Sequence, residues 1–327
     1  MDVSLLSKYR GQLMGLAILL VAMFHSSVVH ANAVIDMFCF CGDMGVDIFF
    51  LVSGFGMYYA YLKRPTWQEF YKKRIVRIVP AWFIVNLIIQ LSDKTLTDID
   101  WSVFGKYMTG LSFWLEGNLY FWYIPAILAF YIITPLFMKF YLKNKKQAYL
   151  IFGGIWIGLL ALSLVFHNAD YFIFLFRWPV YFGGIFLGEC SYKKVEIKKQ
   201  AFVGIGILFV IGVVIENFIR QYNMLRYVRY DYKYLVYFIV AIPLCMMLVC
   251  LFDKVKYEFP VLKFLGGITL EIYLLHEFLL RKVTAYFEVL PFDNLAIVFN
   301  IVVFLGTIAI AFILHTLLDW VFKKLHI

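Results

Sequence analysis

An ionisable imidazole, His25, lies deep within an apolar run of the chain, residues 11–29. A second apolar run, residues 44–62, carries Asp47 near its start. A polar side chain in hydrocarbon costs free energy unless it finds a partner, so both residues are candidates for function. A carboxylate beside an imidazole orients the ring and raises its basicity, which suits a general base. We predict that the two side chains meet and act in catalysis; the alternative for His25 is a structural hydrogen bond between helices.

The depth of His25 follows from its distance along the chain from Arg10, which lies at the cytoplasmic edge of the first run. Fifteen residues at about 1.5 Å each place the imidazole roughly 22 Å from that edge if the run is helical. Asp47 begins the second run from the opposite side of the membrane, at a similar depth. The predicted catalytic pair therefore lies in the outer half of the bilayer.

A late apolar run, residues 264–282, contains Glu271 and His276. They are five residues apart and do not share quite the same helix face, so structural and functional roles fit them equally well. His315 and Asp319 form an i,i+4 pair near the inner end of the last run, and a structural role is favoured for them. Loop or tail positions are expected for the other histidines, His30, His167 and His326. No metal is predicted, because no recognised ligand spacing links His25, His30, Asp36 and Asp43.

A basic cluster, Lys73, Arg74 and Arg77, stands just before an apolar run that opens at Pro80. The two arginines are three residues apart and therefore lie on one helix face. Paired guanidinium groups suit bidentate capture of phosphates. The alternative is that the cluster anchors the chain to anionic lipid headgroups.

The composition is that of a membrane protein: 63% of the residues are hydrophobic, 16% are charged, and the mean hydropathy is +0.82. Soluble domains are about half apolar and roughly a quarter charged. We predict an all-α, polytopic bundle that forms one domain over residues 1–327. Its ten spans are residues 11–29, 44–62, 78–92, 120–140, 148–166, 171–189, 201–219, 233–252, 264–282 and 295–320.

The basic residues decide the orientation of the bundle. With both termini in the cytoplasm, most of the 30 Lys and Arg residues fall in inner segments, as the positive-inside rule requires. The net charge of +9 is therefore explained by membrane topology and does not indicate nucleic-acid binding. The first run reaches about 19 residues and is expected to span the membrane rather than to be a cleaved signal peptide.

Two outer segments are more than connectors. Residues 92–119 form a long loop with Trp101 and Trp114, and long loops in compact proteins are often lids or binding elements. Residues 220–233 are basic and rich in tyrosine. They could contact an anionic or sugar-like acceptor, although an aromatic belt at the membrane interface is favoured.

These pieces, in this order, resemble the acyltransferase-3 family of bacterial integral-membrane acyltransferases, which O-acylate glycans and other cell-surface molecules. The motifs that carry the resemblance are His25 at the end of the first span and residues 45–55, 70–80, 122–135, 177–184 and 266–276. Each motif is weak alone, but six in order are specific. The resemblance implies further site-lining residues, namely Arg10, Ser53, Trp122, Tyr123, Arg177, Glu271, Tyr273 and His276.

The resemblance implies a reaction as well. Acyl-CoA, with acetyl-CoA the expected donor, would approach from the cytoplasm and place its phosphates near Arg74 and Arg77. His25 would act as the base on a hydroxyl of a cell-surface glycan or of its lipid-linked precursor. Membrane lipids and a possible second copy of the chain are the other expected partners.

The chain departs from the family pattern at Met14, where many members have an Arg eleven residues before the His. Arg10 lies one turn earlier on the same helix face and could reach the same cavity. Ile127 stands where the family often has a Glu. The alternative function is a transporter on the same scaffold, which Met14 favours, and a third is a membrane scaffold or sensor without catalysis.

Overall fold

The computed structural model describes residues 2–26, 39, 41–63, 66–92, 99–165, 172–222, 233–286 and 295–325. Within these ranges the regular structure is helical, apart from an isolated bridge between Asp2 and Glu196. The predicted all-α class is confirmed. His30, Asp36, His167, His326 and most of the tyrosine-rich segment, residues 223–232, lie outside the described residues.

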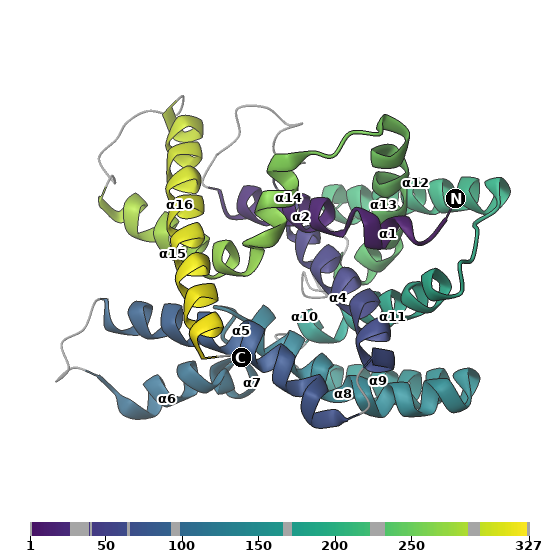
Figure 1. The fold of residues 1–327 in the computed structure, drawn as a ribbon, viewed down its shortest axis with the longest axis horizontal. Coiled ribbons are helices and arrows are strands. Elements are labelled where there is room, and N and C mark those ends of the chain that lie inside the picture. The colour runs from purple at the N-terminus through teal and green to yellow at the C-terminus, as the bar shows by residue number, and fades with distance from the viewer. Residues whose placement is uncertain are drawn as a thin grey trace.

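Ten helices coincide with the ten predicted apolar runs (Figure 1). They are α2 (Arg10–His25), α4 (Met44–Lys63), α5 (Trp67–Leu91), α8 (Tyr123–Lys143), α9 (Lys145–Val165), α11 (Trp178–Tyr192), α12 (Lys199–Tyr222), α13 (Lys233–Val255), α15 (Thr269–Tyr286) and α16 (Leu295–Lys324). The shorter helices are α1 (Leu5–Lys8), η1 (Cys41–Asp43), α6 (Trp101–Thr109), α7 (Leu111–Glu116), α10 (Phe172–Leu175) and α14 (Pro260–Gly267).

Among the residues that the structure describes, seven helices are long and apolar enough to cross a membrane: α4, α5, α8, α9, α12, α13 and α16. The helix that carries His25, α2, is a shorter apolar helix. The sixth predicted run is divided into α10 and α11, because Pro179 in the first turn of α11 starts a new helix there. The ninth run is divided into α14 and α15 at Ile268, directly after two glycines. The first break places Arg177 in the lining of the site described below.

The predicted outer loop, residues 92–119, includes the two short helices α6 and α7. Asp100 caps α6, because its carboxylate accepts hydrogen bonds from two backbone N–H groups of the first turn. Gly110 separates the two helices with a φ of 74°, a left-handed conformation that glycine adopts readily. The side chain of Asn86 on α5 donates a hydrogen bond to the carbonyl oxygen of Tyr107 at 2.8 Å. This bond holds α6 beside α5.

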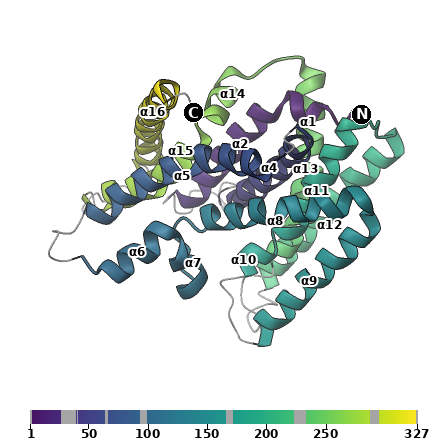
Figure 2. The same ribbon diagram turned by 60° about the horizontal axis from the view of Figure 1, so that its bottom comes forward.

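The central element is α4, which packs against α2, α8, α11 and α13. Figures 1 and 2 show it between α2 on one side and α11 on the other. Its first twelve residues are buried. By contrast, α9, α12 and α16 expose large apolar side chains such as Ile157, Val210 and Val302. An exposed apolar surface of this kind is suited to contact with lipid.

Glycine residues let the central helices approach closely. A Cβ atom added at Gly54 of α4 would lie 2.0 Å from the carbonyl oxygen of Tyr181, and one at Gly184 of α11 would lie 2.2 Å from that of Leu51. A Cβ atom at Gly15 of α2 would lie 1.9 Å from a carbonyl oxygen of α14. Small residues at such crossings are a general feature of membrane helix packing.

We expect Gly54→Ala to force α4 and α11 apart and to destabilise the protein by about 1–3 kcal/mol, the usual cost of overpacking. Thermal unfolding of the purified protein in detergent measures this loss. The matched control is Gly158→Ala on α9, where no other atom lies within 4 Å of the added Cβ. Equal melting temperatures for the two variants would contradict the close approach.

Candidate functional site

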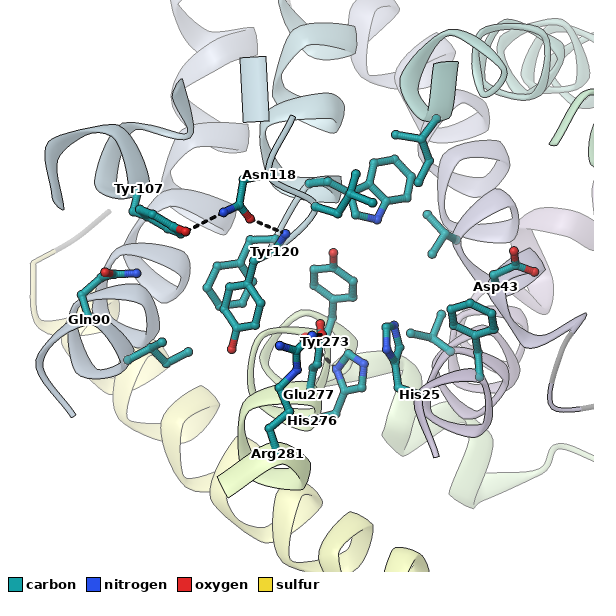
Figure 3. A pocket seen from close by; sticks show the side chains of 18 of the residues that line it. His25, Asp43, Gln90, Tyr107, Asn118, Tyr120, Tyr273, His276, Glu277 and Arg281 are labelled. Atoms are coloured by element: carbon teal, nitrogen blue, oxygen red, sulfur yellow. Dashed lines mark hydrogen bonds and ion pairs between the residues drawn. The ribbon is translucent and has the colours of Figure 1, made fainter. Parts of the chain in front are cut away.

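A cavity of about 780 Å³ lies between α2, α15 and the segment that joins α7 to α8 (Figure 3). Its volume falls within the usual range of small-molecule sites. Its polar lining residues include His25 of α2, Asp43 of η1, Tyr107 of α6, Asn118 before α8 and His276 of α15. We call it the polar cavity. The predicted binding loop, residues 92–119, therefore contributes to its wall.

The two histidines of the polar cavity lie next to each other, as Figure 3 shows. The centres of the His25 and His276 rings are 5.0 Å apart. The Nδ1 atom of His276 lies 2.8 Å from the carbonyl oxygen of Tyr273. A carbonyl oxygen only accepts hydrogen bonds, so Nδ1 carries the proton and Nε2 keeps its lone pair. No described residue offers that buried Nε2 a partner. His276 therefore presents a nitrogen lone pair beside His25.

Charged groups surround the pair of imidazoles. The charges of Glu277, Arg281 and Asp43 act on His25. Glu277 accepts a hydrogen bond from Arg281 one turn further along α15, at 2.5 Å. Burial, followed by the charge of Glu277, raises the pKa of Tyr120, which lies in the segment before α8. Tyr120 thus remains protonated and can donate a hydrogen bond into the cavity.

Asp47 does not meet His25 as predicted. It pairs with Arg177, whose Nε lies 3.4 Å from Oδ1 of Asp47. The side chains are 0% and 1% exposed, so this is a fully buried ion pair. The guanidinium also lies over the ring of Trp122, 5.3 Å from its centre. Because Arg177 lines the polar cavity, the structure assigns Asp47 a supporting place behind that wall.

Buried hydroxyl groups lead from the polar cavity towards the region of Arg10 at the start of α2. The ring of Tyr273 lies 5.8 Å from that of His276 and 5.2 Å from that of Tyr123. Ser53 of α4 forms side-chain hydrogen bonds with Tyr123 and Tyr131 of α8. We call these four residues, Tyr273, Tyr123, Ser53 and Tyr131, the hydroxyl line.

Three arginines meet the inner end of the hydroxyl line. The charges of Arg10, Arg74 and Arg77 all act on Tyr131, although they come from two helices. We call these three residues the arginine cluster. Arg10 lies beside Gly56 of α4, where an added Cβ would be 3.8 Å from its guanidinium carbon. Arg10 thus shares a region with the arginines of α5.

The basic residues of α5 differ in their surroundings. Arg74 is buried and donates a hydrogen bond to the carbonyl oxygen of Phe70 at 2.8 Å. Its guanidinium also lies over the aromatic ring of Phe70. Arg77 is exposed and donates to the carbonyl oxygen of Gly267 at the end of α14, at 3.1 Å. Lys73 is exposed, and no described contact links it to the arginine cluster. The structure therefore groups two of the three predicted phosphate-binding residues.

Glu271 does not line the polar cavity. Its Oε1 lies 2.9 Å from Nδ1 of His315 on α16, and Nε2 of His315 lies 3.6 Å from Asp319. The five-residue spacing explains this arrangement, because it turns Glu271 and His276 to different sides of α15. Glu271 therefore joins α15 to α16.

The sequence analysis missed several lining residues, among them Tyr107, Asn118, Tyr120, Glu277 and Arg281. Glu277 and Arg281 carry a signal that could have been used, since they follow His276 and form an i,i+4 charge pair. Among the described residues, no group of three or more His, Cys, Asp or Glu side chains could hold a metal ion.

Removal of one partner from the buried ion pair should be costly. We expect Arg177→Met to lower the free energy of unfolding by about 3–5 kcal/mol, because the Asp47 carboxylate loses its buried guanidinium partner. Arg177→Met combined with Asp47→Leu should recover much of that loss. The control is Arg281→Met, which removes a side chain that is 71% exposed. If thermal unfolding gives the same loss for the two single variants, the ion pair is not a structural requirement.

Comparison with known proteins identifies the family of the chain. Residues 13–316 match the family model of an acyltransferase domain, Acyl_transf_3. The chain is similar to nodulation protein 10 of Rhizobium leguminosarum bv. viciae, with 22% identity over 151 residues. That match covers 38% of this chain and 41% of the relative, so less than half of either protein is aligned. No solved structure matches. Because the family match spans most of the chain and contains the polar cavity, the protein belongs to the acyltransferase-3 family of membrane acyltransferases.

Proposed function

We propose that the protein transfers an acyl group from acyl-CoA to a hydroxyl of a cell-surface glycan or of its lipid-linked precursor. The single observation that carries this proposal is the hydroxyl line. It runs from the histidine-containing polar cavity to the arginine cluster. An acyltransferase that works across a membrane needs such a pair of regions, one for each substrate.

The arginine cluster suits the donor. Guanidinium groups bind phosphates through paired hydrogen bonds, and CoA carries several phosphate groups. The cluster lies at the end of the bundle where Lys and Arg residues gather, which the positive-inside rule assigns to the cytoplasm. The pantetheine arm would then follow the hydroxyl line towards His25. The buried side chains of Ser53, Tyr123 and Tyr131 fill that line, so they would have to move apart for the arm to pass.

The polar cavity suits the reaction. His25 would take the proton of the acceptor hydroxyl as its oxygen attacks the thioester carbonyl carbon. A C–O bond forms, the C–S bond breaks, and the proton passes to the leaving thiolate of CoA. His276 can share the proton through its free Nε2. Two imidazolium ions with ring centres 5.0 Å apart repel each other, so the pair would hold one proton at a time.

The acceptor would reach the polar cavity from the outer side. Tyr107, Asn118 and Tyr120 are joined by hydrogen bonds along its wall, and Glu277 and Arg281 add an ion pair there. Hydroxyl, amide and charged side chains of this kind can hydrogen bond the hydroxyl groups of a sugar.

We expect His25→Ala to reduce acyl transfer by about 10²–10⁴-fold, the usual contribution of a general base. The assay follows the label of acetyl-CoA into surface polysaccharide of cells that express the protein at equal levels. Gly158→Ala is the control, since that position is remote from the cavity. Activity near that of the wild type in a well-expressed His25→Ala variant would exclude the proposed base.

The donor site gives a separate prediction. Arg10→Met and Arg77→Gln should each weaken the binding of CoA by about tenfold, as loss of a charge-assisted hydrogen bond would. Calorimetric titration of the purified protein with CoA measures this. The control is Lys72→Gln, which removes another exposed cation of α5. Arg10→Met with Met14→Arg should restore affinity if position 10 replaces the Arg that many family members have. Unchanged affinity in both single variants would leave these arginines as lipid anchors.

A further inference from the structure

A second cavity, of about 310 Å³, lies between α2, α15 and α16. We call it the apolar cavity. His276 lines it as well as the polar cavity, so the imidazole stands in the wall between them. The apolar cavity therefore begins beside the atoms that the proposed reaction uses.

The lining of the apolar cavity is suited to hydrocarbon. Its apolar side chains include Leu19, Leu280 and Phe304, and no Asp, Glu, Lys or Arg occurs among its described lining residues. The two hydroxyl groups in the lining are turned away: Ser26 and Thr307 each donate a hydrogen bond to a carbonyl oxygen of the same stretch of chain. His276 and Asn300 also contribute polar groups to this lining, which is otherwise mainly apolar, and a mainly apolar cavity favours apolar ligands.

We propose that the apolar cavity holds the hydrocarbon chain of the acyl group, so that the enzyme accepts acyl chains longer than acetyl. This inference rests on the proposed function. In the reaction the thioester carbonyl must lie beside His25, and the acyl chain starts one bond from that carbonyl carbon. The chain can therefore enter a cavity whose wall is His276. The lipid of a lipid-linked acceptor starts many bonds from the reacting hydroxyl, so it would not begin at this wall.

The volume sets the length of chain that the cavity can accept. An engineered cavity of about 150 Å³ lined by Leu, Ile and Phe holds benzene, with six carbons, so 310 Å³ offers room for roughly ten carbons. An octanoyl chain fits within this limit, whereas an acetyl group would leave most of the cavity empty. Hydrophobic burial then favours the longer chain.

The test uses two neighbouring residues of α16. Val303 lines the apolar cavity, whereas Val302 is exposed on the outside of the same helix. The purified wild type, Val303→Trp and Val302→Trp are titrated with CoA, acetyl-CoA and octanoyl-CoA. We expect the wild type and Val302→Trp to bind octanoyl-CoA at least about tenfold more tightly than acetyl-CoA, because each buried methylene adds affinity. Val303→Trp should bring the two affinities within about twofold of each other.

A second filling variant guards against misfolding. Ala22→Leu narrows the apolar cavity from α2 and should reduce the preference for octanoyl-CoA in the same direction as Val303→Trp. Thermal unfolding shows which filled variants remain folded. Equal wild-type affinities for the two esters would overturn the inference and leave the proposed function intact. The inference would also be overturned, with the proposed function intact, if the filling variants weakened the binding of acetyl-CoA and octanoyl-CoA equally. A wild type that binds neither CoA nor either ester would overturn both proposals.

Discussion

The buried ion pair between Asp47 and Arg177 is the constraint on which the arrangement of the site depends. Burying either charge without the other would cost several kcal/mol of stability. The pair therefore fixes the first turn of α4 against the break between α10 and α11. The glycines of α4 and α11 allow this approach, since a Cβ at Gly54 or Gly184 would collide with the facing backbone. Arg177 is thereby held over Trp122, in the wall of the polar cavity.

From this ion pair, α4 runs from the polar cavity to the arginine cluster. Its first turn carries Asp47 at the level of the polar cavity, and two turns later Ser53 hydrogen bonds to tyrosines of α8. The same helix passes Arg10 at Gly56. One rigid element thus spaces the proposed donor and acceptor regions. A spacing set by a helix is more exact than one set by loops, and acyl transfer requires both reactants at one point.

The positions of the helices could be predicted from the sequence because they depend on local composition. Each of the ten apolar runs overlaps a helix, since about 20 apolar residues in hydrocarbon can satisfy their backbone only in that form. The closeness of His25 and His276 and the charge partner of Asp47 could not be predicted in the same way. They depend on how helices that are far apart in the sequence pack against each other. The spacing of residues within one helix carries no information about that packing.

The error on Glu271 has the same origin. Helical spacing shows that Glu271 and His276 point to different sides of α15, but it does not show which side faces the cavity. Glu271 is turned to the other side of α15 by its contact with His315 of α16. No sequence pattern links His315 to Glu271. For the wall formed by α6 and the segment after α7, the sequence predicted a binding element but not the residues that line the cavity. The length of the loop indicated a binding element, whereas the identity of Tyr107 and Asn118 as lining residues required the fold.

The hydrogen bond from Arg77 to Gly267 has a consequence for how the two ends of the protein communicate. The carbonyl oxygen of Gly267 ends α14, and such terminal carbonyls lack a partner within their own helix. A phosphate bound by Arg77 would compete for the same guanidinium and release that helix end. The released junction leads directly into α15, which carries His276 nine residues further on. Occupancy of the arginine cluster and the position of His276 would then be thermodynamically linked. By reciprocity, any ligand that shifts α15 in the polar cavity would change the affinity for a phosphate at Arg77 by the same factor.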